Sequence, residues 1–314
     1  MRRLYWKKME RIKAGLLPIQ NFLIRGLISI LLLVTITPPS YAQPIDTVTT
    51  INPTRLKTVI IGSTVAYTGI MIGLSSVWYS QYDKQEFQFF NDAGEWNQVD
   101  KAGHFYSAFQ LSSIGSLTLQ WSGVSKKKSD LAGTITSFAV MSSIEVLDGF
   151  SAGYGASASD LLANALGAGF YLGQQALWHE TKIYPKFSFH RTEYAEQRPE
   201  ALGSTLMEQM IKDYNGQTYW LSADVDKFVK FPRWLNLAVG YGAEDMLYAN
   251  EEDNLSNGLN PYRQFYLGID FDLTAIKSKS KFVHSLIYVV NMIKLPAPTL
   301  EFSQGKVKAH FFYF

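Results

Sequence analysis

Four long stretches of this 314-residue chain carry at most one charged residue each, and they constrain the fold more than any other feature. The first, Val59 to Tyr79, is uncharged and long enough to cross the hydrocarbon layer of a membrane. The other three, residues 104–125, 131–147 and 161–178, are less apolar and also fit helices buried in a water-soluble bundle. Of these two interpretations we favour membrane contact.

Composition supports that preference. Aromatic residues make up 14% of the chain and charged residues 18%, a balance typical of proteins that meet lipid. The 29 basic and 27 acidic residues nearly cancel, which argues against nucleic acid as a partner. A phosphate-binding Gly-Lys-Ser/Thr loop and a dinucleotide fingerprint are both missing from the sequence, so we expect no nucleotide. Membrane lipid is the expected partner, and the sequence indicates no particular protein partner.

The N-terminus has the pattern of a signal peptide. Several basic residues precede the apolar run 26–36, and Ser40-Tyr41-Ala42 forms a small-x-small cleavage site. Residues 1–42 are therefore predicted to be removed on export, with an uncleaved anchor as the alternative. Cysteine is absent, which excludes disulfides, thiolate zinc sites and a lipidated cysteine in these 314 residues.

The mature chain divides into two parts by pattern. Residues 43–183 are predicted to form a helical bundle, and residues 184–314 a linker followed by a β-rich region. Strands are expected within 218–228, 235–241, 262–275 and 305–314, with an amphipathic helix over 281–294. The predicted fold class is α+β: a four-helix membrane-type bundle followed by a small, aromatic-rich antiparallel β region.

Polar residues collect at one end of the predicted bundle. If the four helices alternate in direction, the basic residues Arg55, Lys57, 126–128 and Lys182 share one end. The other end then receives the candidate site residues, which are Asp100, Lys101, His104, Glu145, Asp148, Asp160 and Asn164.

Their chemistry leaves three interpretations open. Asp100 and Asp160 at helix starts are ordinary positions for caps. Glu145 is different, because a carboxylate inside an uncharged helix is costly unless it is paired or hydrated. The cluster therefore fixes the helix register, binds a head group or peptide, or holds a metal. For the metal we expect a hard or intermediate divalent ion bound by His104, Glu145, Asp148 and Asp160. No other cofactor is expected.

Three motifs carry a family resemblance: Asp-Lys-x-x-His-Phe at 100–105, Glu-x-x-Asp-Gly at 145–149 and Ser-x-x-Asp-x-x-x-Asn-x-x-Gly at 157–167. Over roughly residues 55–180 the chain resembles the YfiM-type family of predicted periplasmic lipoproteins, a domain of unknown function. It is more distantly similar to VanZ-like membrane proteins. The resemblance implies work in the cell envelope but no particular reaction. The missing cysteine departs from the lipoprotein description.

These observations predict an exported, membrane-associated envelope protein without catalytic activity. Its polar cluster binds an envelope lipid or a cell-wall ligand, or stabilises the bundle. The alternative is a metal-assisted hydrolase or transferase acting on an envelope lipid, so the question of catalysis stays open. Export would place the lysine-rich end outside the cytoplasm, against the positive-inside rule for inner-membrane proteins. We therefore favour the outer membrane or its periplasmic face over the inner membrane.

Overall fold

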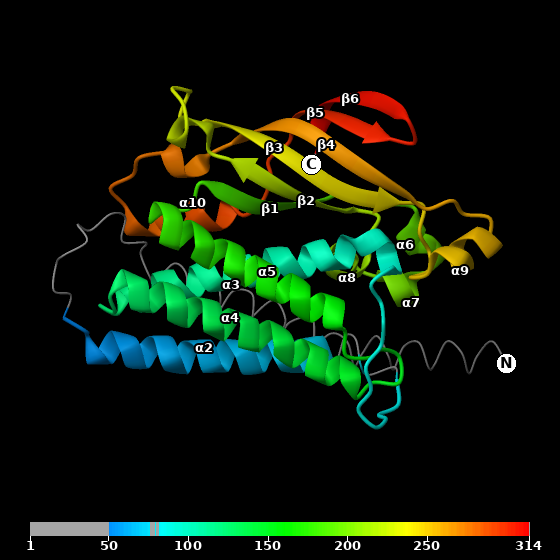
Figure 1. The fold of residues 1–314 in the computed structure, drawn as a ribbon, viewed down its shortest axis with the longest axis horizontal. Coiled ribbons are helices and arrows are strands. Elements are labelled where there is room, and N and C mark those ends of the chain that lie inside the picture. The colour runs from blue at the N-terminus through cyan, green and yellow to red at the C-terminus, as the bar shows by residue number, and fades with distance from the viewer. Residues whose placement is uncertain (1–49, 76–78, 80–81, 314) are drawn as a thin grey trace.

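The computed structural model describes residues 50–75, 79 and 82–313, and the predicted signal peptide lies outside this part of the chain. Within it, long helices fill the N-terminal half and an antiparallel sheet most of the C-terminal half (Figure 1). The predicted α+β class is therefore confirmed. The sheet lies along one side of the helices.

The long helices form where the uncharged stretches predict them. They are α2 (Pro53–Leu74), α3 (Val99–Trp121), α4 (Lys126–Gly149) and α5 (Ala158–Trp178). Local chemistry sets two of the starts. Asn52 caps α2 by accepting a hydrogen bond from the Arg55 N–H at 3.0 Å. Ser157 caps α5 in the same way, through the N–H of Asp160 at 3.0 Å.

The helices alternate in direction, and their basic residues meet at one end as predicted. The Arg55 guanidinium lies over the ring of Trp121, at the end of α3. Lys126 donates a hydrogen bond of 2.6 Å to Gln175, near the end of α5. Residues 126–128 form the first turn of α4. Lys126 pairs there with Asp130 one turn later, at 2.8 Å.

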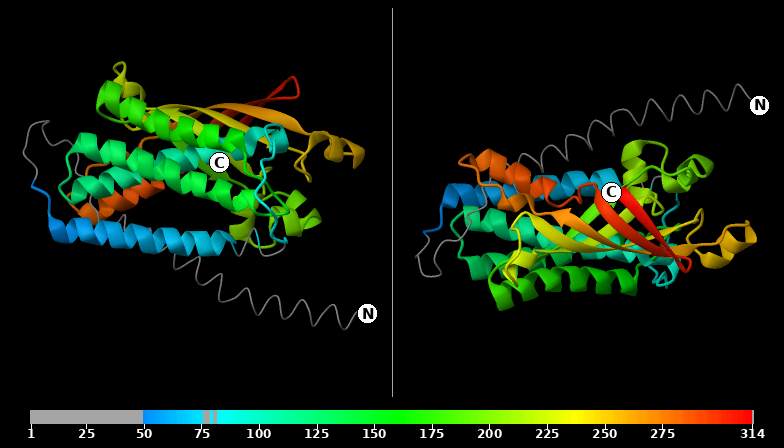
Figure 2. Two further views of the ribbon diagram at one scale, coloured as in Figure 1. Left: turned by 60° about the horizontal axis from the view of Figure 1, so that its bottom comes forward. Right: turned by 90° about the horizontal axis from the view of Figure 1, so that it is seen from above.

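Small residues bring α3, α4 and α5 close together. A Cβ on Gly115 of α3 would lie 3.1 Å from the Cα of Gly133 in α4. A Cβ on Gly167 of α5 would lie 2.1 Å from the backbone oxygen of Phe105, which no real side chain tolerates. α2 lies on the far side of these helices from the sheet (Figures 1 and 2), and the residues it buries are Val59 and Gly73.

Two helices, α2 and α4, are long and apolar enough to cross a membrane. This finding rests on length and composition alone, a test that a buried helix of a soluble protein also passes. Only 11% of the most apolar stretch of α2 is buried, compared with 33% for α4.

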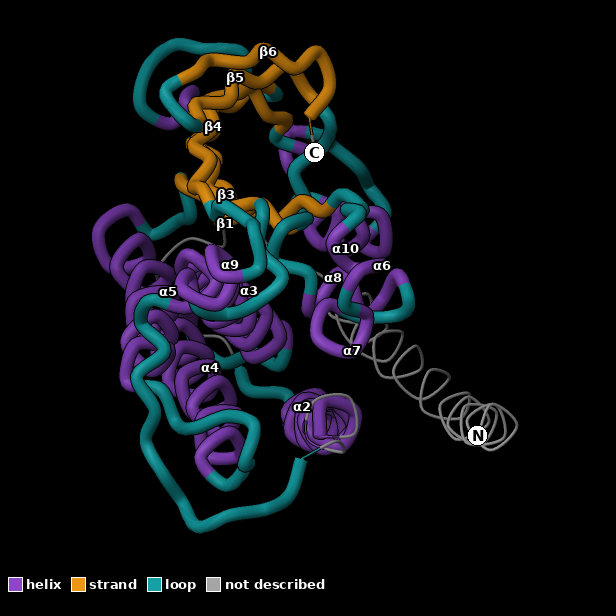
Figure 3. Tube along the Cα trace, turned by 90° about the vertical axis from the view of Figure 1, so that its right-hand side faces the viewer, coloured by secondary structure: helices purple, strands orange, loops and turns teal. Residues whose placement is uncertain are grey.

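Six consecutive strands form one antiparallel sheet in which each strand pairs with the next. They are β1 (Ile183–Phe189), β2 (Gln217–Ala223), β3 (Leu235–Glu244), β4 (Tyr262–Phe271), β5 (Ala297–Ser303) and β6 (Lys306–Tyr313). The predicted amphipathic helix, α10 (Lys281–Val290), joins β4 to β5. The segment after it returns to β1, where Phe187 accepts a hydrogen bond from the Lys294 N–H at 2.9 Å. The sheet is therefore curled (Figure 3).

Two strands were missed by the sequence analysis. β1 occupies the first part of the predicted linker 184–198, and β5 follows the predicted helix. The Lys186 ammonium lies inside the curl, 2.6 Å from the Asp270 carboxylate, so a charged residue stands on a buried strand position.

The shorter elements connect these layers. The segment 199–213, predicted as one helix, forms α7 (Pro199–Leu202) and α8 (Leu206–Lys212) because Gly203 between them adopts a φ of 98°. The others are η2 (Glu95–Gln98), α6 (Tyr194–Gln197), η3 (Val225–Lys227), α9 (Glu251–Ser256) and η4 (Leu273–Ala275). Tyr106 of α3 packs on Phe187 and Tyr219, which attaches the helices to the sheet.

Two glycines of α5 provide a test of this packing. Gly167→Ala should destabilise the protein by about 1–3 kcal/mol, because the new methyl group collides with the backbone of α3. Gly169→Ala is the matched control, since nothing lies within 4 Å of its Cβ position. There the better helix propensity of alanine should stabilise the protein by up to about 1 kcal/mol. Thermal unfolding measures both, and equal unfolding temperatures for the two variants would contradict the packing.

Candidate functional site

All seven predicted site residues lie at one end of the helices, where α3 begins, α4 ends and α5 begins. Two loops close this end. Residues 82–94 run beside residues 149–156 and hold them through backbone hydrogen bonds, among them Gln88 N–H to Gly149 O and Phe90 N–H to Ala156 O, both at 3.0 Å. The site is therefore built from three helix ends and two loops.

Lys101 is the centre of a buried ionic group. Its ammonium lies 2.7 Å from Asp92, 2.8 Å from Asp100 and 2.8 Å from Asp160. These carboxylates come from the loop before η2, from α3 and from α5. One cation thus joins three parts of the chain, and its own side chain is only 13% exposed.

The pKa values of Asp92 and Asp100 are shifted in opposite directions. Burial opposes the ionisation of Asp92, but hydrogen bonds from Lys101, Ser157 and Ser159 outweigh it and lower the pKa of Asp92 to about 2. Burial dominates at Asp100 and raises its pKa to about 6 despite the contact with Lys101.

A strained turn positions this group. Trp96, Asn97 and Gln98 all have left-handed backbone angles, with φ of 47°, 50° and 63°. Such residues cost about 1–3 kcal/mol each and persist only where their surroundings hold them. Here the Trp96 N–H donates to the Ala249 carbonyl at 2.9 Å, and the Tyr241 hydroxyl donates to the Asn97 carbonyl. These three strained residues therefore set the direction in which α3 begins, so that its first turn lies at the site.

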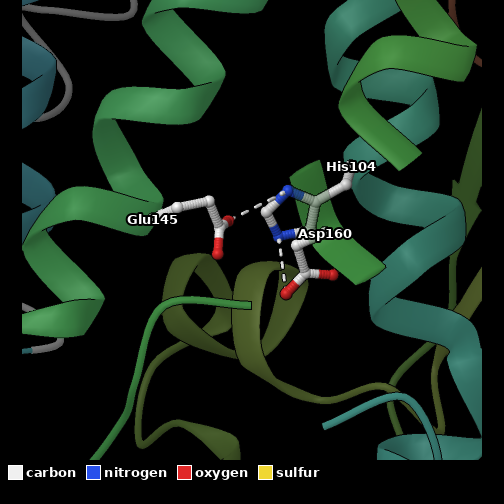
Figure 4. A group of neighbouring side chains, drawn as sticks. All are labelled: His104, Glu145 and Asp160. Carbon is white, nitrogen blue, oxygen red and sulfur yellow. Dashed lines mark ion pairs between the residues drawn. The ribbon is translucent and has the colours of Figure 1, made fainter. Parts of the chain in front are cut away.

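His104 forms a second group beside the first. Its Nδ1 lies 3.0 Å from the Asn164 amide oxygen and 3.7 Å from Glu145 Oε1. Its Nε2 lies 3.8 Å from Asp160 Oδ2, so the ring stands between two carboxylates (Figure 4). Because the Asn164 oxygen can only accept, Nδ1 donates, and in the neutral ring Nε2 then carries the lone pair.

Glu145 carries an unsatisfied atom. Its side chain is almost completely buried, and its Oε2 accepts a hydrogen bond of 3.1 Å from the Ser157 N–H. Its Oε1, which faces His104, has no hydrogen-bond partner in the described part of the chain, and neither has the buried amide nitrogen of Asn164. A buried polar atom without a partner is costly, so such atoms point to a ligand or to bound water.

The arrangement can hold a metal ion. One ligand atom each from His104, Glu145 and Asp160 lie within 4.8 Å of one another. Atoms bound to one ion at about 2.1 Å are separated by up to about 4.2 Å, so small side-chain movements suffice. Asp148 was predicted as a fourth ligand, but it lies outside this grouping and accepts a hydrogen bond of 2.6 Å from the Tyr79 hydroxyl.

Sequence analysis did not single out Asp92, Tyr79 or Glu95. Asp92 and Glu95 belong to the acidic connection between the first two helices, which was expected at this end of the molecule. A loop has no periodicity that marks which acid turns inward, so the connection could be placed but its residues could not.

Removing Lys101 should unfold or strongly destabilise the protein. Lys101→Met leaves three buried carboxylates without their cation, and breaking a buried pair in this way costs about 3–5 kcal/mol. Lys128→Met is the control, because Lys128 is exposed on α4. Chemical denaturation gives both values, and similar stabilities would contradict the central role of Lys101.

Glu95 predicts a pH dependence. Burial, with the nearby charges of Asp92 and Asp100, raises its pKa to about 7. A raised carboxyl pKa means that the folded state holds the proton more tightly than the unfolded chain. The stability that the protonated Glu95 carboxyl gives the folded state is therefore fully present below pH 4.5 and is lost as the pH rises through 7. Thermal unfolding between pH 5 and pH 8 should show a decline that is smaller in Glu95→Gln. An equal decline in both proteins would refute this origin.

Comparison with known proteins adds a family description to this geometry. Residues 88–174, which contain all seven predicted site residues, match the model of a family described as "Predicted periplasmic lipoprotein (DUF2279)". No match was found among curated proteins or solved structures. The similarity to YfiM-type and VanZ-like proteins stays a prediction. The family description confirms the exported, cell-envelope location predicted from the sequence, and over residues 88–174 the chain is similar to a periplasmic lipoprotein family of unknown function.

Proposed function

We propose that this envelope protein binds a divalent cation with His104, Glu145 and Asp160, and that its role is binding rather than catalysis. One observation carries the proposal. Asp160 belongs to two groups of acidic side chains, one around Lys101 and one around His104. In the first group Lys101 supplies the cation. The second group contains a buried carboxylate oxygen without a hydrogen-bond partner among the described residues. The group of His104, Glu145 and Asp160 therefore offers two carboxylates to a bound cation.

The orientation of His104 supports a metal. In the neutral ring with Nδ1 donating to Asn164, the lone pair of Nε2 faces Asp160 Oδ2 across 3.8 Å, so two acceptors point at each other. A cation between them removes that conflict. A histidine whose other nitrogen donates to an amide or carboxylate oxygen is also the usual arrangement of a metal-binding histidine.

The surplus of acids decides what kind of ligand fits. Asp92, Asp100, Asp148, Glu145 and Asp160 surround one lysine and one histidine. A phosphate or carboxylate group would be repelled by this field unless a cation came between. The His104 side chain is 20% exposed, so a bound ion could also contact an anionic group of an envelope lipid or cell-wall polymer. Catalysis by the ion stays the alternative prediction.

The helices would hold the site at a membrane surface. α2 and α4 have the length and composition to enter lipid, and α4 turns apolar residues such as Ile135 and Phe138 outward. We propose that α2 to α5 form a membrane-type bundle with the cation site at one end. We also retain the predicted outer-membrane location as part of this proposal, because the basic residues gather at the opposite end.

Manganese binding to the purified full chain tests the site, read by electron paramagnetic resonance. We expect one bound Mn²⁺, with affinity reduced at least about ten-fold in Glu145→Gln and in Asn164→Ala, which removes the partner of His104. Glu145→Gln preserves the side-chain volume.

His179→Ala is the matched control, since this exposed histidine lies at the other end of α5. Unfolding curves verify that each variant is folded. Absence of Mn²⁺ binding by the wild-type protein, or equal affinity in folded Glu145→Gln, would overturn the proposal.

A further inference from the structure

The sheet has reversed polarity: polar side chains point to its buried face and apolar side chains to its exposed face. In β4, Gln264 and Asp270 are buried, whereas Phe265 and Leu267 are exposed. In β5 the alternation is complete across the strand, with threonine, glutamate and serine buried between exposed proline, leucine and phenylalanine. A sheet packed on an apolar core would show the opposite pattern.

The inside of the curl is occupied by ionic and hydrogen-bonded groups. Lys186 and Asp270, both at most 1% exposed, are paired at 2.6 Å, and Asp270 also accepts from Ser222. Glu301 pairs with Lys308 and His310 at 3.2 and 2.7 Å. This interior also holds an aromatic cluster of Trp220, Tyr266 and Tyr313, whereas the leucines, valines and phenylalanines of β3 to β5 face outward.

The outward side chains form continuous rows across neighbouring strands. One row consists of Leu221, Val239, Leu267 and Leu300, each paired in register with the next. Helix α3 covers this face at β1 and β2 through Tyr106, and Val99 at its start packs on Ala243 at the end of β3. Over the rest of β3 to β5 the face is open, as six large side chains show by their exposure: Leu237, Val239, Phe265, Leu267, Leu300 and Phe302.

The open face has the dimensions and edges of a lipid-facing band. Along β4, from Arg263 to Phe271, it spans about 26 Å at 3.3 Å per residue. The outward positions between these two residues are uncharged. Trp234 stacks on Phe271 at one edge, next to the exposed Arg233, and Tyr241 contacts Phe265 near the other edge. Lipid-facing strands of membrane proteins carry an apolar band of about 25 Å bordered by aromatic residues.

We propose that the outer face of β3 to β5 contacts the hydrocarbon of a lipid bilayer. A bilayer fits better than a second copy of the chain, because exposed apolar residues also line α2 and α4, as at Val65 and Ile135. α2 lies on the opposite side of the molecule from the sheet (Figure 3). A second copy would cover one side, whereas lipid covers all of them. The inference extends the membrane contact proposed for the helices and does not depend on the cation site.

Single-cysteine labelling tests the inference cleanly, because the chain has no cysteine of its own. The full chain is reconstituted in phosphatidylethanolamine and phosphatidylglycerol vesicles with nitroxide-labelled acyl chains. An environment-sensitive fluorophore is placed at Val239→Cys and Leu267→Cys on the sheet and at Ile135→Cys on α4. Glu252→Cys, on the exposed side of α9, is the matched control.

We expect at least about two-fold quenching at the two sheet positions and at position 135, and no quenching at position 252. Quenching at 135 without quenching at 239 and 267 would overturn the inference and leave the helical contact standing. Absence of quenching at all positions would overturn both. A disulfide cross-link between two chains of the Leu267→Cys variant, with no quenching, would identify the face as a contact between copies and also overturn the inference.

Discussion

The contact of one ammonium group with three carboxylates holds the helical part of this protein together. Lys101 joins the loop at Asp92, the first turn of α3 at Asp100 and the start of α5 at Asp160. Each partner would be costly to bury alone, so the group is stable only when all its members are in place. The group ties the loop at Asp92 to the starts of α3 and α5, and it holds Asp160 beside His104.

Both halves of the molecule bury polar groups beside small apolar clusters, which are Ala108, Met141 and Ala168 between the helices and Trp220, Ala238 and Tyr266 inside the sheet. Between the helices, the Asp130 carboxylate accepts hydrogen bonds from Ser116 and Tyr171 and pairs with Lys126. Inside the sheet, Lys186 and Asp270 form the corresponding buried pair. Chains that fold in water bury apolar side chains and expose charges, because burial of apolar surface drives their folding. An interior fixed by hydrogen bonds, with apolar residues outside, is the arrangement that a surrounding hydrocarbon favours.

The sequence predicts the helical half well and the sheet less well, and this difference has a physical cause. A helix of about 22 residues reveals itself by its lack of charge, and its ends by residues such as Ser157, so the cluster of seven site residues could be assembled from spacing alone. β1 was missed because Lys186 contradicts a buried strand unless its partner is known. That partner, Asp270, lies in β4, far from β1 along the chain. Asp92 was missed for the same reason, as only the folded loop brings it to Lys101.

In our proposal, protein surfaces rather than acyl chains make the contact with the membrane. The matching family is described as a lipoprotein, and lipoproteins hold to a membrane through acyl chains on a cysteine. These 314 residues contain no cysteine that could carry such chains. The outer face of the sheet, with α2 and α4, is the surface that we propose for this contact. A lipid anchor would leave the folded domain in water, whereas a lipid-facing sheet and helices place the His104 group at the membrane boundary. There a bound cation would meet the head groups directly.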